Sequence, residues 1–276
     1  MSKMRKNFGF ELLLGVFTLI IMYPLFNLLN ISLKSTKEMI SSPLSITTDF
    51  HFENFAIAFE KMGYLTATMN SLVVTSVSVF IGIIAYTMAG YAISRAKHHR
   101  QFFSGVLFVF VVGMTLPPQS VVTTIAPWLN FLGLNNTRVG LILVFVAAFS
   151  SYGIFLISQF MKTVPAELEE SAIIDGAGPF CVYKNITLPL LNPAIVTLVT
   201  LNAVDTWNNL LFPLIILQGV SKRTVPLAII FAKGEFVTYW NEFFAGMILT
   251  LIPILIFFVI TQKKMISNLT SGALKF

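Results

Sequence analysis

The chain has 276 residues, of which 56% are hydrophobic and only 11% are charged, and its mean hydropathy is +0.82. A soluble domain carries about 25% charged residues, so this composition excludes an ordinary soluble protein and predicts an all-α integral membrane protein. A net charge of +6 would indicate nucleic-acid binding in a soluble domain, but here it indicates Lys and Arg on the cytoplasmic side of a membrane, with lipid and no nucleic acid as a partner.

The first apolar run, residues 8–33, follows a basic N-terminus and contains Pro24 as an expected kink. The run is longer than the apolar region of a signal peptide and lacks an A-x-A-like cleavage site, so we predict an uncleaved first span. A polar stretch at 34–61 comes next. The second span is predicted at 72–94, where small residues such as Gly90 suit close helix packing in lipid.

Residues 101–137 carry no charge and are too many for one membrane helix. Pro117-Pro118 divides the stretch, because proline breaks a helix. We predict a third span at 102–116 and a second piece at 121–134. That second piece is expected to lie along the membrane interface or to re-enter the membrane, because its Trp and Asn suit the headgroup level.

Three more spans are predicted at 139–161, 190–217 and 243–262, which makes about six in total. Six spans place both termini on one side, and the short loops on that side are dense in Lys and Arg. The positive-inside rule therefore predicts cytoplasmic termini in a bacterial cell membrane, inner or cytoplasmic. We treat 1–276 as one transmembrane domain, made of the first span and external loop (1–66), the core spans with a cytoplasmic loop at about 162–189 (67–262) and a cytoplasmic tail (263–276).

Chemical motifs of enzymes are absent from the sequence. There is no G-x-x-x-x-G-K-[ST] phosphate loop, H-E-x-x-H or G-x-S-x-G, so we predict no ATPase of that class, no catalytic residue, no cofactor and no metal. Adjacent residues of a turn rarely converge on one ion, so His98-His99 is expected to be a solvated turn. Cys181 is the single cysteine, which excludes an intrachain disulfide.

The loop between the fourth and fifth spans is predicted to be helix, turn, helix. Pro165, followed by acidic residues, is a helix-start signal. Asp175-Gly176 is expected to break the helix, since glycine adopts backbone angles that other residues resist. Pro179 can open a second short helix, and we expect Pro189 to end it.

This loop resembles the EAA motif of binding-protein-dependent ABC importer permeases, which reads E-A-A, three residues to G, and then I-x-L-P. Glu170-Ser171-Ala172 takes the first place, with Ser171 for the usual alanine, Gly176 is the glycine, and 186–189 is the end. The resemblance implies a coupling helix that docks in a cleft of an ATPase subunit. The residues it assigns to ATPase coupling are Glu167, Glu169, Glu170, Ser171, Ala172, Asp175, Gly176 and Ala177.

Two other stretches are similar to the carbohydrate-uptake branch of that family, as in the smaller permease of the maltose system. Residues 207–214 resemble its W-N-x-x-x-x-P-L stretch, and 269–276 resemble its T-x-G-A-x-K tail. The resemblance implies the type I ABC importer fold, a second homologous permease, two ATPase subunits that bind the ATP, and an extracellular sugar-binding protein. It also implies that Ser271–Phe276 reaches the ATPases and that Val220–Tyr239 probes the binding protein.

A polar stripe is predicted in the fifth span. Its members Asn202, Asp205, Thr206 and Asn209 are spaced i, i+3, i+4 and i+7, which places them on one helix face. A charge near the middle of a span is costly unless it faces protein or water. The stripe therefore lines a translocation path that binds sugar hydroxyls, with Trp207 stacking on the rings, or it forms a polar seam with a partner subunit. The sequence leaves both open.

An alternative from another functional class is an ion-coupled secondary carrier that uses Asp205 as a proton or cation site. Such carriers often show inverted repeats and more than six spans, and neither is visible in this sequence. A permease for another solute, such as a phosphate ester or a polyamine, and a structural membrane subunit are further alternatives.

Overall fold

The computed structural model describes residues 2–96, 99–233 and 239–273, and every regular element in these ranges is helical. The all-α prediction is confirmed. The chain packs into two compact units. Unit 1 comprises Met1–Leu65 and Leu227–Pro253, and unit 2 comprises Thr66–Pro226 and Ile254–Phe276. The treatment of the chain as one domain stays a prediction.

Unit 1 begins with α1 (Ser2–Ser32), which continues through Pro24. No residue of its apolar window is buried by the described chain, as expected for a helix covered by lipid or by another subunit. Two short helices follow, α2 (Thr36–Ser41) and α3 (Glu53–Lys61). The hydroxyl of Ser35 caps α2 by accepting a hydrogen bond from the backbone N–H of Glu38 at 3.1 Å.

A fully buried lysine, Lys34, fixes the turn after α1, with 0% of its surface exposed. Its Nζ donates to the carbonyl of Ser42 at 2.6 Å and to Ser45 Oγ at 2.9 Å, and it lies 3.8 Å from the Glu38 carboxylate. A buried charge is tolerated only when it is paired and hydrogen-bonded. The oxygens around Lys34 meet that need and hold the loop together.

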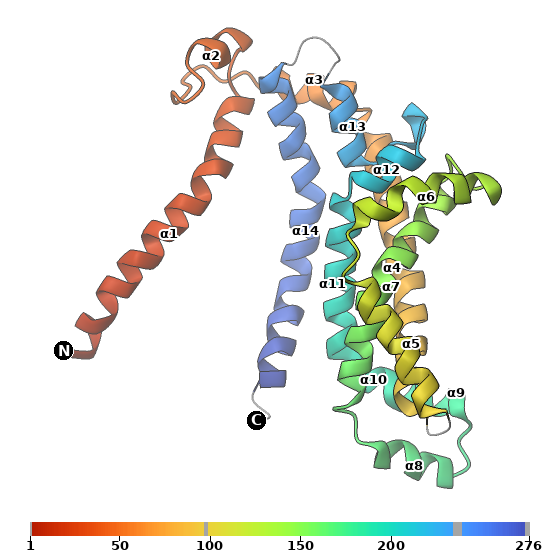
Figure 1. Ribbon diagram of the computed structural model, residues 1–276. Helices are drawn as coiled ribbons and strands as arrows, with labels where there is room; N and C mark the ends of the chain where they lie inside the picture. The colour runs from red at the N-terminus through yellow and green to blue at the C-terminus, as the bar shows by residue number, and fades with distance from the viewer. Residues whose placement is uncertain (1, 97–98, 234–238, 274–276) are drawn as a thin grey trace. The chain divides into compact units, whose positions relative to one another are not determined.

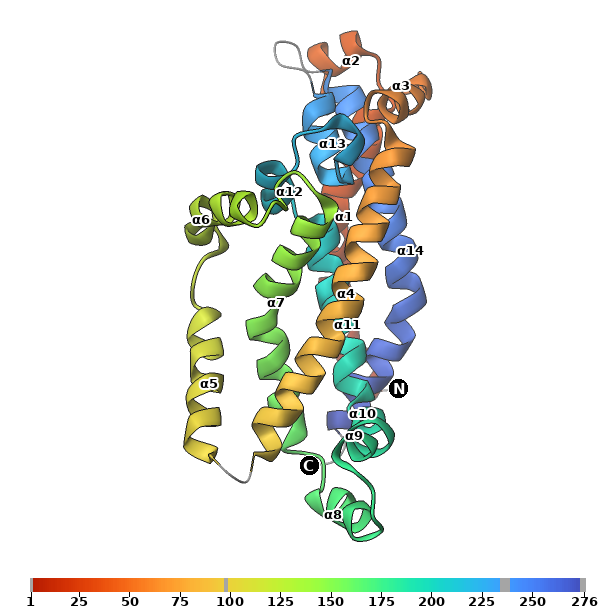
Figure 2. The same ribbon diagram turned by 90° about the vertical axis from the view of Figure 1, so that its right-hand side faces the viewer.

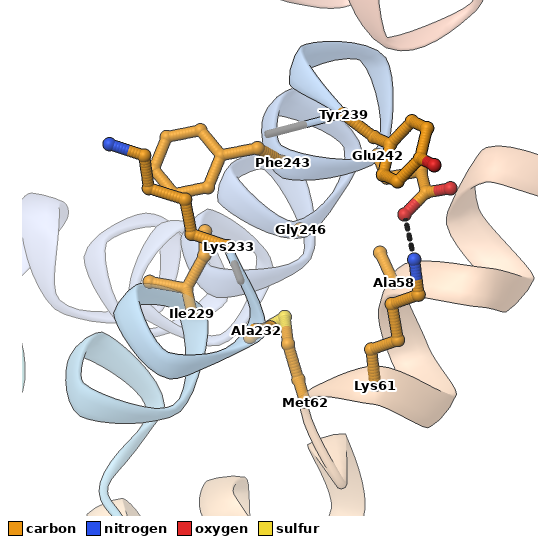
Figure 3. Close-up of a pocket in the computed structure, with 10 residues that line it drawn as sticks. All are labelled: Ala58, Lys61, Met62, Ile229, Ala232, Lys233, Tyr239, Glu242, Phe243 and Gly246. Carbon is orange, nitrogen blue, oxygen red and sulfur yellow. Dashed lines mark hydrogen bonds and ion pairs between the residues drawn. The ribbon is translucent and has the colours of Figure 1, made fainter. Parts of the chain in front are cut away.

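The C-terminal part of unit 1 contains most of α13 (Val225–Ala232) and the start of α14 (Trp240–Ala273). Asn241 Nδ2 donates to Asn54 Oδ1 at 2.9 Å, which joins α14 to α3. Lys61 forms an ion pair with Glu242 at the rim of a small cavity, as Figure 3 shows. These contacts connect parts of unit 1 that are far apart in the sequence.

In unit 2, three long helices lie side by side (Figure 2): α4 (Tyr64–Arg95), α7 (Arg138–Met161) and α11 (Asn192–Asn208). The side chain of Tyr86 on α4 occupies the space that a Cβ at Gly153 on α7 would fill. Gly90, one of the small residues predicted in the second span, serves the same close packing, because a Cβ at this position would lie 2.5 Å from a side-chain carbon of Ile157 on α7. A buried cluster joins the ends of α7 and α11 that adjoin the connecting loop, and its members are Ile157, Met161, Val164, Leu191, Ala194 and Leu198.

The uncharged stretch after α4 is two helices, as predicted from its two prolines. Helix α5 (Arg100–Gly113) and helix α6 (Pro118–Phe131) are bent by 104° at the break between them. Proline at the first position of α6 suits a helix start because its missing N–H would have no partner there. At about 1.5 Å per residue, the 14 residues of α5 are shorter than a full membrane span of about 30 Å.

The prediction of a single, continuous helix for the fifth span, over 190–217, is wrong. Helix α11 ends at Asn208, Asn209 has an extended backbone with ψ 123°, and a separate helix, α12 (Leu211–Ile216), follows. The side chain of Asn209 explains the break, since its Oδ1 accepts a hydrogen bond from the backbone N–H of Phe212 at 3.1 Å and caps α12. A 3-10 turn, η2 (Val220–Lys222), comes next.

Four described helices are long and apolar enough to cross a membrane: Gly9–Ser32, Tyr64–Arg95, Arg138–Met161 and Trp240–Gln262. Two bent helix pairs raise the number to six when each pair is taken as one span. One pair is α5 with α6. The other is Pro179–Leu190 with α11, bent by 74°.

Candidate functional site

The loop between α7 and α11 projects from one end of unit 2 and carries its own helix, α8 (Ala166–Ile174), as Figures 1 and 2 show. Pro165 precedes its first residue, as the helix-start signal predicts. The helix ends at Asp175, and Gly176 follows with φ +85°. That backbone region favours glycine, so the predicted break is confirmed at the predicted residues.

The return from α8 to α11 is helical, but it is not a simple second helix. Pro179 opens α9 (Pro179–Val182), as predicted, and a π-helical turn (Tyr183–Thr187) and α10 (Leu188–Leu190) follow. The helical segment Pro179–Leu190 ends one residue after Pro189, which was predicted to end it. Pro189 itself lies in the first turn of α10, where a missing N–H is tolerated, and the chain bends at Leu191.

The outer surface of this loop combines acids with large apolar side chains. Glu167, Glu170, Ser171 and Asp175 are exposed, and Ala172 and Ala177 are half-buried. Four large apolar side chains are exposed beside them, with Ile174 the most exposed at 86%: Leu168, Ile173, Ile174 and Phe180. An exposed apolar patch with acids around it indicates a surface for another protein.

Glu169 differs from the other acids of α8, because only 5% of its surface is exposed. Its carboxylate accepts hydrogen bonds from Arg95 Nε at 2.9 Å and from Thr187 Oγ1 at 3.0 Å. In this conformation the charge of Glu169 is neutralised within the chain. Its carboxylate is therefore not presented to a partner, although the resemblance to the family assigns Glu169 to ATPase coupling. Sequence reasoning missed Arg95 and Thr187, because no spacing pattern connects them with Glu169.

The predicted polar stripe in α11 divides into two groups. Asn202 and Thr206 are buried, and Thr206 Oγ1 donates to Asn202 Oδ1 at 3.1 Å. Asp205 is exposed. Asn209 does not share their helix face, because the helix ends one residue earlier. Trp207 is buried, with 5% exposed, so its ring is not available for stacking on a sugar in this conformation.

An open hollow of about 540 Å³ lies where two helix breaks meet in unit 2. One break is between α5 and α6, and the other is between α11 and α12. Polar groups of the hollow come from both: Gln119 from α6, and Asp205, Asn208 and Asn209 from the end of α11. Non-helical backbone at membrane depth is tolerated where it is buried in protein or lines a water-filled cavity.

Comparison with known proteins identifies the family. The sequence profile described as "Binding-protein-dependent transport system inner membrane component" matches residues 78–268, which include α8, both helix breaks and the hollow. The chain belongs to this family. The match covers more than half of the protein, so the resemblance of the EAA-like loop extends over most of the spans.

Relatives of this inner-membrane component are named as permeases. The probable starch degradation products transport system permease protein AmyC of Thermoanaerobacterium thermosulfurigenes is 33% identical over 261 residues, which cover 94% of each chain. The multiple sugar-binding transport system permease protein MsmG of Streptococcus mutans is 30% identical over 267 residues, which cover 95% of each chain.

A solved structure supports the fold of the inner-membrane component. A chain in the crystal structure of a bacterial ABC transporter involved in the import of the acidic polysaccharide alginate superposes with a TM-score of 0.78. The match covers 95% of this chain and 97% of that chain at 21% sequence identity. The prediction of an ABC importer permease fold is confirmed.

Some predictions for this inner-membrane component fall outside the described residues. His98 of the predicted histidine turn lies there, as do residues 274–276 of the tail and 234–238 of the external loop. The roles predicted for the tail and for the external loop stay predictions.

Proposed function

We propose that the chain is the permease subunit of an ATP-driven importer of sugars and that its substrates are oligosaccharides. It would assemble with a second homologous permease, two ATPase subunits and an extracellular sugar-binding protein. The relatives named for starch degradation products, for multiple sugars and for arabinooligosaccharides support the substrate class. The chain has no phosphate loop, so ATP is bound by the ATPase subunits and the permease needs no cofactor.

The observation that carries this proposal is the exposed surface of α8. A short helix held between two long helices can carry a rigid-body motion into the membrane. Its apolar side chains supply contact area for a cleft on an ATPase subunit, and Glu167 can pair with basic groups there. Closure of the ATPase subunits on ATP would displace α8 and switch the spans from inward-open to outward-open.

The proposal includes an orientation. Docking to ATPase subunits requires α8 to face the cytoplasm, and an even number of spans then places both termini on that side as well. The loops between 34 and 61 and between 220 and 239 would face the binding protein outside the cell. The positive-inside rule supports the same orientation.

The hollow at the two helix breaks is the proposed part of the translocation path. Amide and carboxylate groups of Gln119, Asp205 and Asn208 can donate to and accept from sugar hydroxyls. Broken helices are a frequent location of substrate sites in transporters. The competing interpretation is a polar seam to the second permease, and it predicts lost assembly instead of altered substrate preference.

The test is co-purification followed by reconstitution. The proteins that leave the membrane with this chain in mild detergent should include two ATPase subunits and a second permease. In proteoliposomes, uptake of oligosaccharides should need ATP and the binding protein and should survive collapse of a proton gradient. Uptake by the purified chain alone, driven by an ion gradient, would instead support a secondary carrier that uses Asp205.

A further inference from the structure

Helix α8 is joined by the chain to α7 and α11, but its buried acid is bonded to a third helix. Arg95 is the last residue of α4, and its Nε donates to Glu169 at 2.9 Å. Its Nη2 donates to the backbone carbonyl of Val164 at 2.8 Å, in the turn that precedes α8. One guanidinium therefore ties the end of α4 both to α8 and to the turn that leads into it.

The same carboxylate ties α8 to the segment Pro179–Leu190, here called the return segment, which leads from α8 back to α11. Thr187, which has 0% of its surface exposed, donates from Oγ1 to Glu169 at 3.0 Å. Both oxygens of the Glu169 carboxylate therefore have partners. Charge-assisted hydrogen bonds of this kind are about twice as strong as neutral ones, and their geometry fixes the three segments relative to one another.

A second tie joins the return segment to α4 at a different level. The hydroxyls of Tyr183 and Thr87 lie 2.8 Å apart in a buried hydrogen bond. The Tyr183 ring also packs against Tyr91, with the ring centroids 5.2 Å apart. Thr87 is eight residues before Arg95, which is about 12 Å along the helix. The loop is therefore held to α4 at two separate points.

We propose that Arg95, Glu169 and Thr187, here called the α4 clamp, make α4 part of the body that moves with α8. These are positioning residues: they transmit the displacement of the ATPase-docking helix into a span that does not adjoin the loop in the sequence. Without the clamp, α8 could tilt against the end of α4, and its displacement would reach α4 only indirectly, through Tyr183 and through the packing of α7. This inference rests on the proposed function, because it needs an ATPase that moves α8.

The experiment uses the assembled complex in proteoliposomes and measures sugar imported per ATP hydrolysed. The first variant is Glu169→Gln, which keeps the size of the side chain and removes the charge. The second is Thr187→Val, which conserves volume and removes the hydroxyl. The matched control is Arg100→Gln, which removes an exposed positive charge from the first residue of α5.

Both clamp variants are expected to keep the ATPase subunits bound and ATP hydrolysis active, while import per ATP falls about tenfold for Glu169→Gln and less for Thr187→Val. The double variant Arg95→Glu with Glu169→Arg exchanges the two charges. It should recover part of the import per ATP that is lost in Glu169→Gln. Arg100→Gln should behave as the wild type. A structural role alone would reduce the amount of complex without changing this ratio.

An unchanged ratio in Glu169→Gln and Thr187→Val overturns the clamp. Loss of the ATPase subunits from both variants, with no recovery in the charge exchange, also overturns it, because Glu169 would then contact the ATPase directly. Wild-type complex that binds no ATPase or imports no sugar on ATP contradicts the proposed function itself. The wild-type measurement therefore separates the two failures.

Discussion

Glu169 of α8 and Asp205 of α11 differ in how their charge is satisfied. Glu169 is buried and bonded on both oxygens within the chain. Asp205 is exposed in the hollow, and its carboxylate has no hydrogen bond or ion pair among the described residues. A charge satisfied internally gives rigidity, whereas a charge left open at membrane depth needs water, substrate or another subunit. Under the proposed function, Glu169 makes the loop rigid, and Asp205 is the group through which the hollow contacts water, substrate or another subunit.

The largest effect is expected from a change in the packing of α7 against α4, the helices that support the loop with α8. Gly153→Leu places a side chain on the ring of Tyr86, between α7 and α4. Overpacking of this kind costs about 1–3 kcal/mol or more, so we expect little folded protein in the membrane and a lower melting temperature in detergent. The control is Gly105→Leu in α5, where a Cβ meets nothing within 4 Å. Equal yields of the two variants would contradict the packing role of Gly153.

A second change tests the hinge after α8. Gly176→Leu forces a leucine to φ +85°, which costs about 1–2 kcal/mol and changes the direction of the chain between α8 and α9. We expect membrane insertion to be intact and ATP-driven uptake to be abolished. Uptake assays and immunoblots of membranes measure the two outcomes. Gly178→Leu, at a position with negative φ, should retain uptake. Normal ATPase coupling in the Gly176 variant would count against a role for this hinge.

A third change tests the role of the exposed carboxylate of Asp205. Asp205→Asn is expected to lower sugar uptake about tenfold, because a hydrogen bond to a charged group contributes about 1.5–3 kcal/mol. The melting temperature of the chain should change little, since the Asp205 carboxylate has no hydrogen bond or ion pair with the residues that the structure describes. Altered preference among sugars would support direct contact, and lost assembly would support the seam. Glu11→Gln in α1, another exposed acid of a span, should take up sugar at the wild-type rate.

The smallest expected effect concerns an exposed pair outside the spans. The hydrogen bond to Glu53 raises the pKa of His51 above its ordinary value of 6.5 and lowers the pKa of Glu53 below 4.5. The stabilisation from His51 is therefore full below pH 6.5 and is lost as pH rises through its folded pKa. The stabilisation from Glu53 is present above pH 4.5 and is lost as pH falls through its folded pKa.

The pair is thus strongest between about pH 4.5 and pH 6.5. In the wild type, the melting temperature should be highest in this range and should fall slightly as pH rises through the folded pKa of His51 or falls through the folded pKa of Glu53. The same small dependence should disappear in His51→Gln. An NMR titration of the His51 ring with a midpoint below 6.5 would contradict the pairing.

Long apolar runs bounded by charges were predicted closely from the sequence. The fourth span was predicted at 139–161, and α7 occupies Arg138–Met161, since Arg138 and Lys162 limit the run. The division at Pro117-Pro118 was also predicted, because proline acts on the backbone locally. The family signature located α8 and its glycine turn, since both depend on residues adjacent in the sequence.

The failures share a physical cause, which is the hydrogen bonding of a side chain to a group that the spacing of residues in the sequence does not reveal. The break at Asn209 depends on its amide capping Phe212, and an uncharged run hides this. The burial of Glu169 depends on Arg95, 74 residues away in the sequence. Spacing showed that three acids lie on one short helix, but it could not show which of them faces inward.

The lysine inside the turn after α1 affects how sidedness can be measured. Membrane-impermeant amine reagents would report which loops face outside, and Lys37 and Lys61 can react with them because neither is buried. Lys34 lies a few residues from Lys37, but its amine is enclosed by carbonyl, hydroxyl and carboxylate oxygens. Lys34 should therefore stay unlabelled from either side of the membrane. The absence of label on Lys34 would indicate an intact turn and not a cytoplasmic location.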